Sequence, residues 1–309
     1  MPSSEPPTPP QPQSPDSSWT HYEVCQRVRL AVAGLPAHFQ TDTRIEGISA
    51  TDIFTLNAAL GATIEDQLVA TLNRVRATWD PEGRYSLYAF VRQPQTFPDV
   101  LLRGAPDKAG GKPDIVMGLE LKGWYLLSKE REPSFRYTVT PAACAPADLL
   151  VCVPWALKNV LSGAPMVFEP YVEKAKYAAE LRNYYWQHKR TTRGDAGIAP
   201  PPGPVAPYPN KSKQIGDVPR SDRGGNFGRY ARTGIMDSYL TQALAQPLCG
   251  IAAGSWLDFF KLFTESASER AVAERIALLR RKMADATATA DRSKADVYLQ
   301  ILDILEANL

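Results

Sequence analysis

An acidic residue and a lysine stand close together within an apolar segment of the sequence. The segment DIVMGLELKGWYLL (114–127) is rich in β-branched and aromatic residues, which predicts a β-strand, and it contains Glu120 and Lys122. Alternate side chains of a strand point to the same face, so these two project together. Charges in a buried strand need a partner, a metal ion or a water-filled cleft, because uncompensated burial is costly. The pair therefore indicates a site for chemistry, an internal charge cluster, or two solvated charges on an exposed strand face.

A second carboxylate can reach this pair from a neighbouring strand. Between residues 97 and 120, three aspartates each follow a proline: Asp99, Asp107 and Asp114. Turn residues separate FPDVLLR (97–103) from the strand 114–127, which predicts an antiparallel hairpin. A turn centred between positions 109 and 110 pairs residues whose numbers sum to 219, which places Asp99 opposite Glu120 with Cβ atoms about 5 Å apart. Asp107 then belongs to the turn, and Asp114, the second choice, lies roughly 20 Å along the strand. We therefore expect Asp99 to join the pair.

Two carboxylates beside an ammonium group suit one kind of chemistry. Carboxylate oxygens are ligands that Mg²⁺ prefers, and this cation binds through one or two of them together with substrate phosphate oxygens. Bound Mg²⁺ stabilises the charge that develops on a phosphoryl group and lowers the pKa of bound water. A nearby lysine can orient or activate that water. The predicted chemistry is the Mg²⁺-dependent hydrolysis of a phosphodiester.

These residues resemble the signature of a known superfamily. Pro98-Asp99, followed after twenty residues by Glu120-Leu121-Lys122, is similar to the motif of the PD-(D/E)xK nucleases, and the size and element order of the chain are similar to those of type II restriction endonucleases. The resemblance covers roughly residues 50–190. It implies that Asp99, Glu120 and Lys122 are catalytic, that the two acids bind Mg²⁺, and that the lysine assists the attack of water.

The superfamily also suggests a third acidic residue near the metal. Some members carry a helix glutamate there, and Glu65 occupies the comparable place in the helix that precedes the predicted strands. The resemblance therefore makes Glu65 a further candidate metal ligand beside Asp99 and Glu120. A solvated glutamate near a helix N-terminus is the alternative for this residue.

The activity that the resemblance implies is sequence-specific cleavage of double-stranded DNA, leaving 5′-phosphate and 3′-hydroxyl ends. A homodimer is expected, because palindromic DNA sites mirror protein two-fold symmetry. A cognate DNA methyltransferase is expected in the same system. Two alternatives stay open: a non-catalytic DNA-binding protein, and a repair or recombination nuclease of the same superfamily.

The elements that must position these residues follow from hydrophobic periodicity. Apolar residues recur at steps of three and four from Ile64 to Trp79, which predicts a helix over 51–79 that Gly61 interrupts. Three strand-like segments follow and are expected to form an antiparallel meander: 85–93, 97–103 and 114–127. The unbroken apolar run 148–157 predicts a central strand covered on both faces, and a helix is expected over 171–188. The fold class is therefore α/β, a mixed central sheet flanked by helices, as in restriction endonucleases.

The remaining segments set the domain organisation. Residues 1–18 are proline-rich and are expected to form a disordered tail rather than a signal peptide, while 19–48 give only weak signals. The rest, 19–309, is expected to be a single catalytic domain whose part 235–309 is helical and either packs on the core or shares in a dimer interface. Four scattered cysteines and the lack of an apolar stretch of about 20 residues predict a reduced, soluble, cytoplasmic protein without a membrane span.

Basic residues are concentrated in one proline- and glycine-rich segment. The formal net charge of the chain is only +2, yet 189–232 alone holds nine basic and three acidic residues, a charge of +6. A basic loop over 189–234 suits contact with DNA phosphates. The alternative is a solubilising linker between the sheet and the C-terminal helices. The residues expected to contact DNA are Lys189, Arg190, Arg193, Arg220, Arg223, Arg229 and Arg232.

Overall fold

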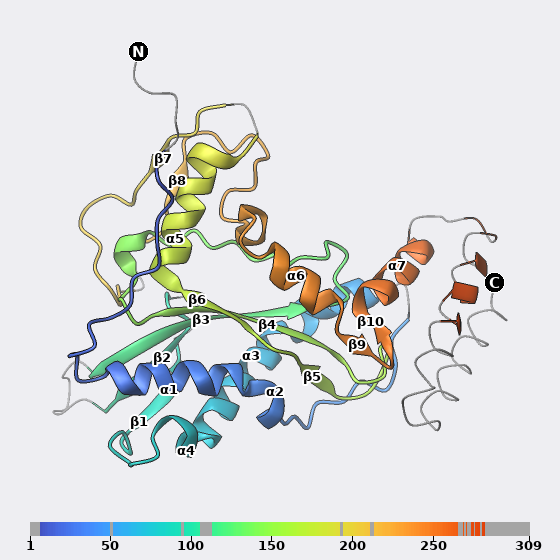
Figure 1. The fold of residues 1–309 in the computed structure, drawn as a ribbon, viewed down its shortest axis with the longest axis horizontal. Helices are drawn as coiled ribbons and strands as arrows, with labels where there is room; N and C mark the ends of the chain where they lie inside the picture. Colours follow the sequence, from blue (N-terminus) through green and yellow to red (C-terminus); the bar gives the residue numbers. More distant parts are fainter. Residues whose placement is uncertain are drawn as a thin grey trace.

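The computed structural model describes residues 7–49, 52–93, 96–105, 113–191, 194–210 and 213–264, and nine residues between 268 and 281. Its centre is a mixed, curled six-stranded sheet packed with helices (Figure 1). The strands of this sheet are β1 (Tyr88–Arg92), β2 (Val100–Gly104), β3 (Ile115–Tyr125), β4 (Leu149–Leu157), β5 (Pro165–Val167) and β6 (Tyr171–Lys174). The predicted α/β class is confirmed.

The order of the strands agrees with the expected meander. β1, β2 and β3 are successive antiparallel neighbours, and β3 then pairs in parallel with β4. Both β5 and β6 pair antiparallel with β4, so β4 has neighbours on each side. Every residue of β4 is buried, which confirms the prediction of a central strand covered on both faces.

The register of the β2–β3 hairpin is the one predicted. Val100 lies opposite Leu119, and Leu102 lies opposite Met117, so the paired numbers sum to 219. The register shifts only beyond Leu102, where Arg103 pairs with Ile115. The hairpin therefore brings the residue before β2 next to the middle of β3.

Helices cover the sheet. They are α1 (Tyr22–Ala33), α2 (Leu35–His38), α3 (Leu56–Arg74), α4 (Arg76–Trp79), α5 (Ala175–Tyr184), α6 (Asp237–Leu244) and α7 (Ala253–Thr264), with short helical turns η1 (Ile53–Thr55), η2 (Pro141–Ala143), η3 (Tyr185–Lys189) and η4 (Tyr230–Thr233). The helix α3 packs on β3 and β1, and Ile64, Leu68 and Leu72 of the predicted stripe are buried. Gly61 lies within α3 and does not interrupt it. None of the helices in the described part of the chain is long and apolar enough to cross a membrane.

Two elements differ from the sequence-based expectations. The predicted helix over 171–188 begins only at Ala175, because Tyr171–Lys174 pair with β4 as strand β6. In addition, α1 arises from a segment that gave only weak signals, although Val24, Val28 and Leu35 bury one face of this region. Its β-branched valines have low helix propensity, so packing rather than local preference accounts for the helix.

The basic loop is folded against α5. Within it, β7 (Ile198–Ala199) pairs with β8 (Val218–Pro219), and Figure 1 shows this ladder beside α5, with α6 and α7 further along the molecule. Past the loop, β9 (Pro247–Leu248) pairs with β10 (Ile251–Ala252). Residues 7–18 form no helix or strand, although Pro15 is buried. The described residues from Arg270 to Arg281 are helical, and the rest of the C-terminal part that was expected to be helical, 282–309, lies outside the described residues.

Candidate active site

Asp99, Glu120 and Lys122 meet at the start of the β2–β3 hairpin. The Lys122 Nζ atom lies 2.7 Å from Asp99 Oδ2 and 2.9 Å from Glu120 Oε1. Glu120 and Lys122 are both in β3, and Asp99 immediately precedes β2, so the hairpin register creates this contact. The predicted proximity of the three side chains is confirmed.

Backbone groups orient the two carboxylates. The Asp99 N–H donates to Glu120 Oε2 at 3.3 Å, and the Leu121 N–H donates to Asp99 Oδ2 at 3.2 Å. These bonds cross between the two strands, so each carboxylate is held by the strand opposite its own. Gly118 also matters, because a Cβ atom there would lie 2.1 Å from Pro98 Cγ. The absence of a side chain at this position lets Pro98 approach β3 closely.

The cluster contains two carboxylates but only one ammonium group, so it can accommodate a further positive charge. Burial raises the pKa of Glu120 to about 7, against the opposing effect of Lys122. Burial works to lower the pKa of Lys122, but Glu120 and Asp99 outweigh it and hold that pKa above its usual value. Lys122 is therefore an ammonium group at neutral pH. It compensates one of the two carboxylates when both are ionised.

The donor set fits Mg²⁺. Lys122 occupies one oxygen of each carboxylate, and no donor among the described residues bonds to Asp99 Oδ1. Across the described part of the chain, no three His, Cys, Asp or Glu side chains are arranged to share one metal ion. Mg²⁺ needs only one or two protein carboxylates, because water and substrate phosphates complete its shell. Asp99 and Glu120 together therefore meet its requirement.

Glu65 lies on the α3 side of the same cluster. Its Oε1 accepts the Gly123 N–H at 3.2 Å, and its Oε2 lies 3.4 Å from an Arg92 nitrogen. Burial raises the pKa of Glu65, and Lys122 opposes that shift. Glu65 lies in the middle of α3 and its side chain is only 20% exposed, so it is not a solvated residue near a helix N-terminus.

The other aspartates are placed elsewhere. Asp114 lies at the opposite end of the hairpin, where its backbone oxygen accepts the Gly104 N–H and its carboxylate accepts the Tyr88 hydroxyl. Asp107 lies outside the described residues. Of the described aspartates that follow a proline, Asp99 is thus the one beside Glu120.

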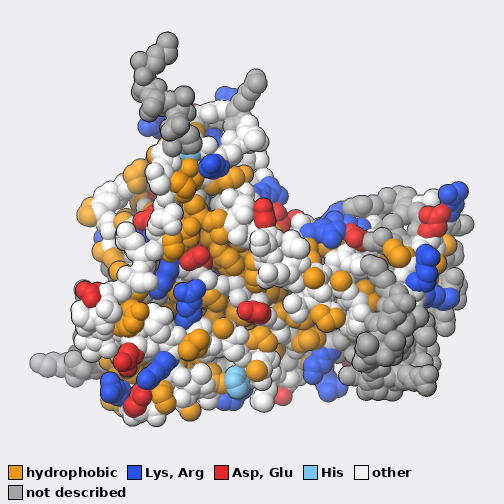
Figure 2. Space-filling view, in the orientation of Figure 1, with side chains coloured by type: hydrophobic (Ala, Val, Ile, Leu, Met, Phe, Trp, Pro, Cys, Tyr) orange, Lys and Arg blue, Asp and Glu red, His pale blue; other side chains and the backbone are white. Residues whose placement is uncertain are grey.

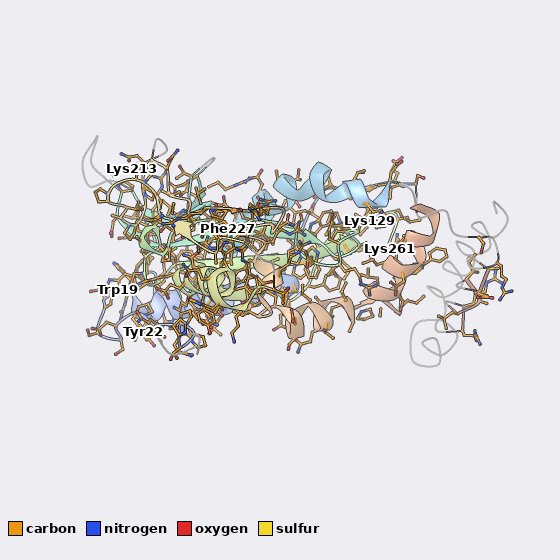
Figure 3. All side chains as sticks on the ribbon, turned by 90° about the horizontal axis from the view of Figure 1, so that it is seen from above. Trp19, Tyr22, Lys129, Lys213, Phe227 and Lys261 are labelled. Carbon is orange, nitrogen blue, oxygen red and sulfur yellow. The ribbon has the colours of Figure 1, made fainter. Side chains whose placement is uncertain are left out.

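Asp99 and Glu120 line a cavity of about 260 Å³. Its other walls come from the segment before β2 and from the basic loop: Thr96, Phe97, Pro209, Asn210, Lys213 and Ile215. Figure 3 shows Lys213 at the end of the molecule away from Lys261. The predicted basic loop therefore reaches the acidic cluster, which the sequence did not indicate.

The basic residues expected to contact DNA fall into two groups. Arg229 and Arg232 both donate to Glu132 Oε1, at 2.7 and 2.8 Å. Arg190 lies over the Trp186 ring, 3.6 Å from its centroid. The side chains of a second group are exposed: Lys189, Arg220 and Arg223. Arg193 lies outside the described residues.

Two buried polar clusters that the sequence analysis missed anchor the basic loop. Arg182 pairs with Asp217 at 2.6 Å and also donates to the Tyr137 backbone oxygen. Asp148 accepts the Tyr208 hydroxyl at 2.9 Å, together with two backbone N–H groups. An acid directly before the apolar run 149–157 was the only sequence signal for Asp148.

Comparisons of the chain with models of protein families, with curated proteins and with solved structures give no match.

Proposed function

We propose that the protein is a Mg²⁺-dependent, sequence-specific endonuclease of double-stranded DNA, with a fold like that of the type II restriction enzymes in the PD-(D/E)xK superfamily. The observation that carries the proposal is the convergence of Asp99, Glu120 and Lys122 on a cavity that the basic loop also lines. A solvated charge pair on a strand face would not need a third charged residue from the neighbouring strand.

Each residue has a distinct role in this proposal. Asp99 and Glu120 would hold Mg²⁺, which when bound supplies positive charge at the phosphoryl group and lowers the pKa of water. Glu65 supports the cluster from α3, by fixing the backbone of β3 at Gly123. Lys122 donates a hydrogen bond to the attacking water and neutralises the charge that grows on the phosphate oxygens. Hydrolysis leaves a 5′-phosphate and a 3′-hydroxyl.

The basic loop would supply the contacts with DNA. Its exposed arginines, Arg220 and Arg223, suit phosphate oxygens or guanine. Figure 2 shows that the outline of the molecule is indented between the part that carries α5 and the part that carries α7, with charged side chains along the indentation. The proposal includes a homodimer on a palindromic site and a cognate DNA methyltransferase in the same system.

Incubation with unmethylated plasmid DNA tests the proposal. We expect discrete fragments with Mg²⁺ and none with EDTA. Lys122→Ala should abolish cleavage, because the water and the phosphate lose their cationic partner. Lys176→Ala is the matched control, since this half-buried lysine lies on α5 outside the cluster and pairs with Glu180. Failure to cut any DNA, or equal cutting by Lys122→Ala and the wild type, would contradict the proposal.

A non-catalytic DNA-binding protein is the second candidate. It is favoured by the ion pairs that Lys122 makes with both carboxylates, because such a cluster can be purely structural. This candidate predicts salt-sensitive DNA binding that needs no metal and that Asp99→Asn leaves unchanged. A repair or recombination nuclease of the same superfamily would instead prefer damaged or branched DNA over one short sequence.

A further inference from the structure

The cavity beside Asp99 and Glu120 has a second wall of different chemistry. Asn210 and Lys213 line it from the basic loop, and Thr96 lines it from the segment before β2. The Asn210 amide and the Lys213 ammonium group of this wall can both donate hydrogen bonds. The two walls together form a site with carboxylates on one side and donors on the other.

Polar side chains of this second wall have no hydrogen-bond or ion-pair partner among the described residues. The Lys213 side chain is exposed, and no carboxylate in the described part of the chain lies within ion-pair distance of it. The Thr96 hydroxyl oxygen is buried and has no hydrogen-bond partner among the described residues. Because the Thr96 hydroxyl oxygen has almost no accessible surface, the groups of this wall that a ligand can reach are the Lys213 ammonium and the Asn210 amide.

Contacts on both sides hold the second wall in place. The Lys213 N–H donates to the Asn210 backbone oxygen at 3.0 Å. On one side of this pair, the Tyr208 hydroxyl bonds to buried Asp148. On the other side, the Ile215 backbone oxygen accepts the Thr140 N–H at 2.7 Å. Hydrogen bonds to Asp148 and Thr140 therefore hold the backbone on both sides of Lys213.

The size of the cavity limits what it can hold. Pockets for drug-sized ligands span roughly 300–1,000 Å³, and this cavity has about 260 Å³. It is therefore too small for a base pair but suits a phosphate with part of its sugar. A phosphate also complements Lys213 and Asn210, which can both donate to its oxygens.

We propose that Lys213, with Asn210, forms a subsite for a backbone phosphate of the nucleic acid next to the phosphate that is cut. This inference rests on the proposed function. A phosphate in the subsite faces two carboxylates, so its binding is strengthened when a divalent cation lies between them. Phosphate and Mg²⁺ therefore bind with positive coupling, and each raises the affinity for the other.

Thymidine 3′,5′-bisphosphate is a suitable probe, because it carries two phosphates and no phosphodiester bond. Titration calorimetry of the full chain should show binding that is tighter with Mg²⁺ than with EDTA. Lys213→Ala should weaken binding in Mg²⁺ roughly tenfold or more, as expected when a hydrogen bond to a charged group is removed. Lys213→Arg should restore most of it, and Lys176→Ala should leave it unchanged.

The outcomes separate this inference from the proposed function. Equal binding by Lys213→Ala and the wild type, or no binding to the wild type at millimolar probe, overturns the subsite. If such a result accompanies DNA cleavage by the wild type, the endonuclease proposal stands alone. If the probe binds through Lys213 but no DNA is cleaved, the phosphate subsite stands and the endonuclease proposal fails.

Discussion

The choice between Asp99 and Asp114 is decided by single hydrogen bonds. Asp99 Oδ2 accepts from Lys122 Nζ, whereas the Asp114 carboxylate accepts from the Tyr88 hydroxyl at the other end of the hairpin. We expect Asp99→Ala to lower the rate of DNA cleavage roughly a hundredfold or more, because the proposed Mg²⁺ site would lose one of its two carboxylates. Asp114→Ala should retain cleavage. Initial rates on plasmid DNA in Mg²⁺ measure both variants.

Asp114→Ala serves as the control for Asp99→Ala. Both aspartates follow a proline and flank the same hairpin, so a general loss of charge or of hairpin stability would affect the two variants alike. Equal rates for Asp99→Ala and Asp114→Ala would remove Asp99 from the site. Mg²⁺ binding by calorimetry should fail in the first variant and persist in the second.

Some of the site could be predicted from sequence, for a physical reason. Asp99 and Glu120 are joined by one hairpin, and the register of a hairpin follows from its turn and its alternating faces. Lys213 could not be placed in this way. Its position depends on Asp148 and Tyr208, which are 60 residues apart in sequence and meet only in the folded chain. No local pattern specifies such a contact.

At the scale of elements, Asp148 joins β3, the start of β4 and the basic loop. It accepts the Gly118 and Ala145 N–H groups, both at 2.7 Å, and the Tyr208 hydroxyl. Burial raises its pKa to about 7, while these bonds and the charge of Lys174 oppose that shift. The ordinary value is about 4, so the folded state binds this proton more tightly than the unfolded state does.

The pH dependence of stability follows from that difference. A raised carboxyl pKa contributes stability below about pH 4, and this contribution is lost as the pH rises through about 7. We therefore expect the free energy of unfolding to fall more steeply between pH 4 and 7 in the wild type than in Asp148→Asn. Urea denaturation across this range measures the difference, and parallel profiles for the two proteins would contradict it.

The elements themselves differ in how far sequence specifies them. The helix α3 was predictable, because its buried stripe repeats at helical spacing within one segment. The strand β6 was not, since Tyr171 and Val172 join the helix pattern in sequence but pair with Cys152 and Val151 in the sheet. When pairing with a distant strand competes with a short helical turn, the neighbouring strand determines which secondary structure forms.

At the scale of the molecule, one buried ion pair ties the basic loop to the core. Arg182 on α5 is 2% exposed and Asp217 is 4% exposed, and they are joined at 2.6 Å. Arg182 also lies over the Phe227 ring and donates to the Tyr137 backbone oxygen. Removing one partner of such a pair leaves an uncompensated buried charge. The basic loop is therefore packed on the core, and the backbone that carries its exposed arginines is held in place.

The arginines of the basic loop differ in how available they are to DNA. Arg220 and Arg223 are exposed, and no carboxylate in the described part of the chain lies within ion-pair distance of either. Arg229 and Arg232 instead share Glu132. A phosphate must compete with this carboxylate to bind the second pair, so they release fewer counterions when DNA binds.

The salt dependence of DNA binding measures this difference. For each DNA phosphate that the protein no longer neutralises, the slope of log K against log salt concentration becomes shallower by about 0.9. We expect Arg220→Ala and Arg223→Ala each to reduce the slope by about that amount. Arg229→Ala, which removes an arginine that is only 14% exposed and is paired with Glu132, should change the slope much less. Fluorescence anisotropy of a labelled duplex over a range of NaCl concentrations gives the slopes. If Arg229→Ala lowers the slope as much as Arg220→Ala, the Glu132 pairing does not withhold Arg229 from DNA.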